Sequence, residues 1–92
     1  MEVKKMSART LKCVRDHAKS FYNKAEVYTE NGIAYLRSYD TTVCSIDQNG
    51  KFRRHWRGYS ATTMRHVNEF CYQYGIDVRG KAEWCALEVV PR

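Results

Sequence analysis

The stretch that decides the fold is residues 25–56, which read AEVYTENGIAYLRSYDTTVCSIDQNGKFRRHW. Polar and apolar residues alternate along much of it, and β-branched and aromatic side chains are frequent, a pattern typical of strands. Glu30-Asn31-Gly32 and Asp47-Gln48-Asn49-Gly50 interrupt the pattern, and both contain Asn and Gly, which tolerate the positive φ of tight turns. We therefore predict an antiparallel meander with one face on the core and one face in water. Its four strands are Ala25–Thr29, Ile33–Tyr39, Thr41–Ile46 and Lys51–Trp56.

Short helical patterns are found at both ends of the chain. From Ser7 to about Phe21 the apolar residues recur every three or four positions, and Ser7 is a suitable N-cap, which predicts an N-terminal helix. Residues 80–87 predict a short terminal helical segment that docks Trp84 and Leu87.

The pattern of a longer helix follows the last predicted strand, in residues 59–75, which read YSATTMRHVNEFCYQYG. Ser60 or Thr62 can cap its first amides, and Gly75 is well placed as its left-handed stop. We expect its apolar stripe to cover one face of the sheet, so that residues 1–92 form a single α+β domain. The stripe consists of Met64, Val67, Phe70, Cys71 and Tyr74.

The composition is that of a small globular domain, with 92 residues, 43% of them hydrophobic and 28% charged. It excludes a membrane protein, a multidomain enzyme and a disordered tail. No stretch is apolar enough for an export signal or a membrane span, so we expect a cytoplasmic protein.

The cysteines are expected to be reduced thiols that pack as small hydrophobic residues in that compartment. They are Cys13, Cys44, Cys71 and Cys85. A zinc site is the alternative, although structural zinc usually has more closely spaced ligand pairs. Its ligands would be Cys13, His17, His66 and Cys71. We expect no metal and no cofactor.

Positive charge is concentrated in two places, residues 1–24 and the segment KFRRHWR at residues 51–57, and the chain as a whole carries +6. Strand alternation places Arg53 and His55 on the face opposite Phe52. If that face is wet, cations and aromatic rings lie together on it, as on sheets that stack bases and neutralise phosphates. Tyr and Arg would equally suit a protein interface. The candidate binding residues are Lys51, Arg53, Arg54, His55 and Arg57, with Tyr35, Arg37 and Tyr39 from the neighbouring strand.

A dense polar cluster begins the helix predicted at residues 59–75. Its members are Tyr59, Ser60, Thr62, Thr63, Arg65, His66 and Glu69. Ser60 and His66 invite a hydrolase interpretation, but there is no nucleophile-elbow motif and a domain of this size leaves little room for a substrate cleft. Helix capping and hydrogen bonds to the sheet explain the same residue types, so we expect no enzyme activity.

Part of the chain resembles a family of small proteins from bacteriophages and mobile elements of Gram-positive bacteria. The resemblance covers about residues 19–75. It rests on Lys19-Ser20-Phe21-Tyr22, Ser38-Tyr39-Asp40-Thr41 and Tyr59-Ser60-Ala61-Thr62-Thr63 with Arg65-His66 and Glu69-Phe70. The family has no assigned function, so the resemblance implies a phage or mobile-element setting and no catalytic residues.

Two functions fit these features. The first is a stoichiometric inhibitor or modulator of a host protein or nucleoprotein, such as a CRISPR-Cas-type defence complex, by analogy with anti-CRISPR proteins. The alternative is a basic module that binds DNA or RNA for the element's own replication or regulation. No membrane partner is expected. Pairing of an open sheet edge, at Ala25–Thr29 or Lys51–Trp56, would make a homodimer.

Overall fold

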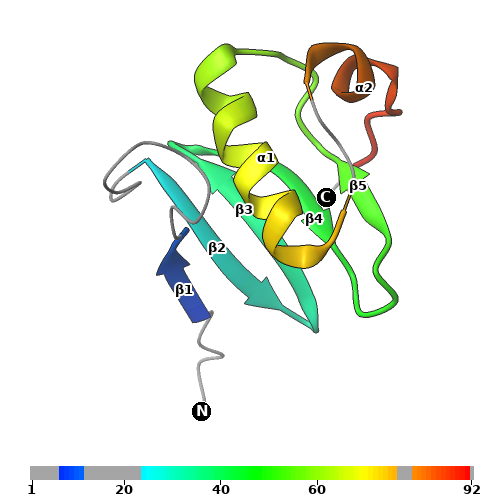
Figure 1. The fold of residues 1–92 in the computed structure, drawn as a ribbon. Helices are drawn as coiled ribbons and strands as arrows, with labels where there is room; N and C mark the ends of the chain where they lie inside the picture. Colours follow the sequence, from blue (N-terminus) through cyan, green and yellow to red (C-terminus); the bar gives the residue numbers. More distant parts are fainter. Residues whose placement is uncertain (1–6, 12–23, 77–79, 92) are drawn as a thin grey trace.

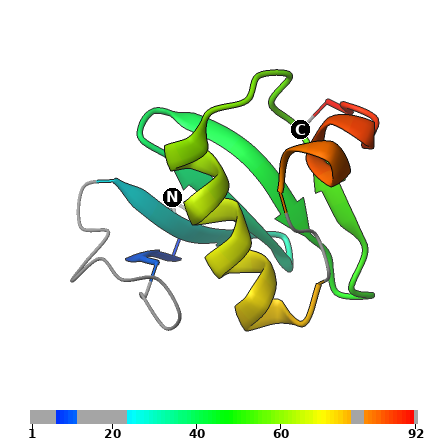
Figure 2. The same ribbon diagram turned by 45° about the horizontal axis from the view of Figure 1, so that its top comes forward.

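The computed structural model describes residues 7–11, 24–76 and 80–91, and within them the fold is α+β (Figure 1). Five strands form one antiparallel sheet in the order β1-β2-β3-β4-β5. They are β1 (Ser7–Thr10), β2 (Ala25–Glu30), β3 (Ile33–Ser38), β4 (Thr41–Ile46) and β5 (Phe52–Arg54). Helix α1 (Ala61–Tyr74) crosses one face of the sheet, and the short helix α2 (Lys81–Ala86) lies beside β5 (Figure 2).

Three of the four predicted strands agree with the structure to within a residue, because local turn chemistry determines where they end. Asn31 and Gly32 join β2 to β3 with φ of 54° and 79°, the left-handed conformation that these residue types tolerate. The turn between β4 and β5 is closed by Asp47, whose Oδ1 accepts the amide hydrogens of Asn49 at 2.9 Å and Lys51 at 3.0 Å. β5 is shorter than predicted.

The N-terminal helix that we expected to begin at Ser7 does not begin there. Residues Ser7–Thr10 form strand β1, which pairs antiparallel with β2 and brings Arg9 opposite Val27. The strand conformation is favoured because it pairs the backbone edge of β2, which a helix in this place would leave without partners. Leu11 follows β1, is buried, and donates its amide hydrogen to the Ala25 carbonyl at 2.9 Å; the rest of the predicted helix, residues 12–21, lies outside the described residues.

Helix α1 begins and ends where its sequence indicates. Ser60 is extended, with φ −149°, and its hydroxyl accepts the amide hydrogen of Thr63 at 3.0 Å. Gly75 ends the helix in the left-handed region with φ 73°. Of the predicted apolar stripe, Tyr74 remains 39% exposed and the other four residues are buried.

The core lies between α1 and the sheet and extends to Trp84 of α2. A β-bulge shifts the register between β3 and β4, so that Leu36 pairs with Cys44 whereas Arg37 pairs with Thr42. Val43, the extra residue of the bulge, is buried as well as its neighbour Cys44. Buried members of the core are Leu11, Ala25, Val27, Ala34, Leu36, Val43, Cys44, Ile46, Met64, Val67, Phe70, Cys71 and Trp84.

Two of the predicted core thiols pack as expected. Cys44 and Cys71 are free and buried, whereas Cys85 is free and exposed. Burial raises the pKa of the Cys71 thiol to about 12 and the pKa of Cys44 well above its usual value, so both stay protonated and unreactive at neutral pH. Cys13 and His17 of the alternative zinc site lie outside the described residues, among which no three potential ligands cluster.

The two sheet edges proposed for dimerisation are both occupied. Strand β2 lies inside the sheet, between β1 and β3. Strand β5 is an edge strand, but the C-terminal segment lies along it, with Val89 forming a parallel bridge to Arg54 and Val90 donating its amide hydrogen to the Arg54 carbonyl at 2.8 Å. Neither described helix has the length and apolar character needed to cross a bilayer.

Candidate functional site

Arg54, one of the predicted binding residues, is buried between β5 and the C-terminal segment and is only 6% exposed. Its guanidinium donates to main-chain carbonyls of Trp56 at 2.8 Å, Arg57 at 2.6 Å and Trp84 at 3.0 Å. It also lies 4.8 Å from the centre of the Trp84 ring. The last carbonyls of a helix are partly negative, which helps a buried cation to remain there. Arg54 is therefore buried, and its guanidinium holds β5 to the segment before α1 and to α2.

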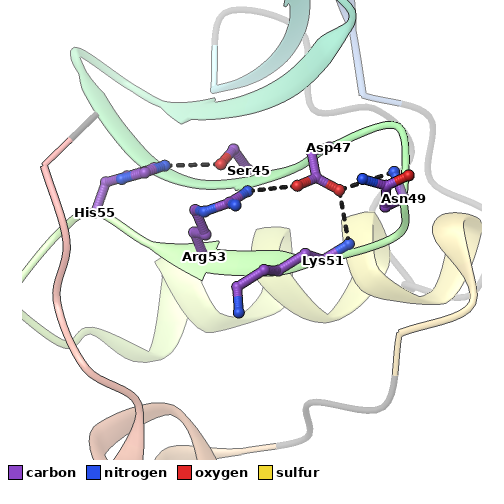
Figure 3. Close-up of polar contacts among 6 residues, drawn as sticks. All are labelled: Ser45, Asp47, Asn49, Lys51, Arg53 and His55. Atoms are coloured by element: carbon purple, nitrogen blue, oxygen red, sulfur yellow. Dashed lines mark hydrogen bonds and ion pairs between the residues drawn. The ribbon is translucent and has the colours of Figure 1, made fainter.

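Arg53 lies on the opposite face of β5, as the strand alternation predicts, but it is already paired. Its Nη1 is 2.7 Å from Oδ2 of Asp47, in the turn that joins β4 to β5 (Figure 3). The pKa of Asp47 is lowered, first by the amide hydrogen of Lys51 and then by Arg53. The Lys51 ammonium points away from this carboxylate and is exposed.

His55 is held at both ring nitrogens. Its Nδ1 is 2.8 Å from the carbonyl of Val90, which can only accept, so Nδ1 carries the hydrogen. In the neutral ring Nε2 then accepts from the Ser45 hydroxyl at 2.7 Å (Figure 3). His55 thus fastens the C-terminal segment to the sheet.

The expectation that this second face is wet is wrong at its centre. Tyr35 is 8% exposed and Tyr28 5%, and their rings stack with centres 5.0 Å apart. The ring of His55 lies 6.0 Å from Tyr35 on the other side. Because these side chains pack on one another, they leave no open platform for stacking bases. Of the basic segment, Lys51 and Arg57 remain exposed.

Two members of the polar cluster at the start of α1, Thr63 and His66, anchor the helix to Ser38 at the end of β3. The Ser38 hydroxyl is 2.8 Å from Nδ1 of His66 and 3.2 Å from the Thr63 hydroxyl, and all three side chains are buried. Glu69 is buried and accepts from Gln73 at 3.2 Å. The exposed residues of the cluster are Tyr59, which has Lys81 5.2 Å above its ring, and Thr62 and Arg65.

The Ser38 contacts hold the end of β3 against α1, and the turn formed by Tyr39 and Asp40 follows directly. We expected Tyr39 to continue strand β3, but the strand ends at Ser38 and Tyr39 has a left-handed φ of 55°. A bulky residue in that region costs about 1–2 kcal/mol, and Gly or Asn usually takes such positions. The Tyr39 amide donates to the Lys24 carbonyl at 2.8 Å, and its side chain is 51% exposed. Its ring lies 5.9 Å from the ring of His66.

A shallow hollow of about 220 Å³ opens beside this turn and is lined by Lys24, Glu26, Arg37, Tyr39 and Asp40. The Nε of Arg37 donates to the Tyr39 carbonyl at 3.2 Å and lies 3.9 Å from Glu26. Within the described part of the chain, the two terminal nitrogens of Arg37 have no partner. The same holds there for the Lys24 ammonium and the Asp40 carboxylate. We call these five residues the Tyr39 hollow.

The comparisons with known proteins place the chain in a family. Residues 1–86 match DUF8033, a family of unknown function. The chain belongs to this family. No curated protein and no solved structure gives a significant match.

The sequence identified part of this site. Arg37 and Tyr39 were predicted as binding residues, whereas Lys24, Glu26 and Asp40 were not. Lys24 and Asp40 flank strands, so the alternation within strands carries no information about them. The sequence does contain one signal for this site. The link between β3 and β4 has only two residues, Tyr39 and Asp40, and its first position, which requires a positive φ, carries neither Gly nor Asn.

Proposed function

We propose that this member of DUF8033 is a small non-enzymatic binding protein that attaches stoichiometrically to a host protein or nucleoprotein and modulates it. The source is a bacteriophage or mobile element of Gram-positive bacteria, the site of action is the host cytoplasm, and a CRISPR-Cas-type defence complex is the best example of such a target. The observation that carries the proposal is the Tyr39 turn, an exposed aromatic residue held in a costly conformation. Local strain of this kind is concentrated at functional sites.

The chemistry around the turn supports a protein partner. Tyr and Arg are the residue types that most often carry the energy of protein interfaces, and here Tyr39 and Arg37 lie in the same hollow. The Tyr39 amide donates to the Lys24 carbonyl, and Nε of Arg37 donates to the Tyr39 carbonyl. The backbone of the turn and the guanidinium are thus ordered before any partner arrives, which reduces the conformational entropy lost on binding.

The alternative function, binding of DNA or RNA, is supported by the net charge of +6 and by the exposed Lys51 and Arg57. Two observations weaken this alternative. Tyr35 is buried and cannot stack on a base, and Arg53 is already paired with Asp47. If this alternative holds, labelled oligonucleotides will bind with an affinity whose logarithm falls steeply with log salt and will lose affinity when Lys51 and Arg57 are changed to Gln.

A capture experiment tests the proposal. Tagged wild-type protein, Tyr39→Ala and Tyr72→Ala are each incubated with nuclease-treated host lysate, and the retained proteins are quantified. Tyr72 is a matched control, since it is 49% exposed and lies on α1. We expect a partner in near-stoichiometric amount with the wild type and the control, and at least tenfold less with Tyr39→Ala. Equal capture by all three proteins would overturn the role of the Tyr39 turn.

A further inference from the structure

We propose that the Tyr39 hollow receives a carboxylate side chain of the partner protein, bound by the two terminal nitrogens of Arg37 with Lys24 beside it. This inference rests on the proposed function and names the chemistry that the surface recognises. It is carried by the Arg37 guanidinium, which the Tyr39 carbonyl orients and whose two terminal nitrogens have no partner among the described residues.

Arg37 is prepared for such a ligand by its own contacts. Nε donates to the Tyr39 carbonyl at 3.2 Å, which orients one edge of the planar group, and Glu26 lies 3.9 Å from the same nitrogen. The terminal nitrogens on the other edge have no partner within the described residues. A fork of two parallel N–H groups matches the two oxygens of a carboxylate.

The Arg37 guanidinium is exposed enough for a partner side chain to reach it. The side chains of Arg37 and Glu26 are 46% and 42% exposed, so neither is sealed beneath the sheet. The hollow gives a partner side chain a concave surface, and Tyr39, which is 51% exposed, is one of the residues that line it. Burial of that ring and desolvation of the ion pair would occur together on binding, which strengthens the pair.

The charges of the hollow favour a single carboxylate over a phosphate backbone. Lys24 and Arg37 contribute two positive charges, and Glu26 and Asp40 contribute two negative charges, so the formal total is zero. A nucleic-acid strand carries one negative charge about every 3.4 Å, and further phosphates would meet these carboxylates. A protein segment can instead place one acidic side chain on Arg37 and a neutral or basic neighbour near Asp40.

The test is an NMR titration of the isotopically labelled protein with three probes at constant ionic strength. The probes are the blocked peptide Gly-Gly-Glu-Gly-Gly, its Gln counterpart, and inorganic phosphate. We expect millimolar binding of the Glu peptide, seen as saturable shifts of the Arg37 Nε–H signal and the Asp40 amide, with much smaller shifts from the other two probes. Equal shifts from the Gln peptide, or larger ones from phosphate, would overturn the inference.

Matched variants show whether Arg37 is responsible. Arg37→Gln is expected to weaken binding of the Glu peptide about tenfold, since a charge-assisted bidentate pair is lost. Arg57→Gln removes the same charge from another exposed arginine and is expected to change the affinity less than twofold. If both variants weaken binding equally, general electrostatic attraction explains the shifts and the inference is wrong. Failure of the proposed function looks different, because partner capture would then not depend on Tyr39.

Discussion

At the scale of single residues, two turn residues, Tyr39 and Asp47, are held in contrasting states. Tyr39 has a left-handed backbone in a position suited to Gly or Asn. Asp47 is ionised in a turn where two amide hydrogens and Arg53 surround it. Tyr39 is strained and exposed, so we assign it to function. The Asp47 carboxylate has hydrogen-bond donors at both oxygens, so we assign it to folding.

Tyr39→Asn is expected to stabilise the protein by about 0.5–1 kcal/mol, because Asn adopts the left-handed region at lower cost. Loss of the ring contact with His66 offsets part of the gain. Urea denaturation measures the change, and the same variant should lose partner capture. A lower unfolding midpoint with unchanged slope would contradict the expected gain in stability.

Asp47 is expected to make the protein sensitive to acid. Its folded-state pKa lies below its usual value, so its contribution to stability is present above the unfolded-state pKa and is lost as pH falls through the folded-state pKa. A carboxyl NMR titration should give a midpoint below 3.8. Arg53→Gln should raise that midpoint only in part, because the Lys51 amide is the larger cause. A midpoint unaffected by folding would contradict this account.

At the scale of elements, contacts between segments distant in the chain determine how strand β5 and helix α2 are held. The guanidinium of Arg54 reaches main-chain carbonyls before α1 and at the end of α2, and the Trp84 indole donates to the Gly58 carbonyl at 2.9 Å. A separate contact, between Ser38 and His66, joins the end of β3 to α1. Helix α1 thus supports the Tyr39 turn, while Arg54 holds β5 to the segment before α1 and to α2.

Arg54→Ala is expected to lower the free energy of unfolding by about 2–4 kcal/mol, because a buried side chain is removed and several buried or partly buried carbonyls lose a charged donor. Arg54→Lys should recover little of this loss, since an ammonium does not reproduce the planar fork. Arg57→Ala, on an exposed neighbour, should change the stability by less than about 0.5 kcal/mol. Chemical denaturation compares the three, and equal effects of Arg54→Ala and Arg57→Ala would mean that the Arg54 contacts contribute nothing.

At the scale of the whole molecule, the C-terminal segment completes the sheet. Val89 and Val90 lie along β5, and His55 binds the Val90 carbonyl. The segment therefore covers backbone groups that would otherwise form an open edge, and open edges promote association between chains. The binding surface proposed here lies at the β3–β4 turn and leaves this edge closed.

Removal of residues 88–92 is expected to expose β5 and to produce concentration-dependent self-association, measured by light scattering after gel filtration. Removal of residues 91–92 alone keeps Val89 and Val90 and is the control, for which the mass should match that of the intact chain. If the longer truncation has the same mass distribution as the intact chain at every concentration, the segment does not protect the edge.

The sequence by itself determined the elements whose causes are local. Strands β2, β3 and β4 follow from alternation between turns, and α1 follows from its apolar stripe with Ser60 and Gly75 at its ends. The orientation of Arg53 also follows, since a strand's two faces alternate. Each of these features depends on a few neighbouring residues, so the local sequence is enough to predict it.

Only the tertiary structure decided the rest, because it depends on partners distant in the chain. Ser7–Thr10 is a strand since β2 offers it an edge, and Arg54 is buried since α2 brings carbonyls to it. The Tyr39 hollow combines Lys24 and Glu26 from the start of β2 with the turn after β3, a juxtaposition that pairing creates and that no local pattern contains.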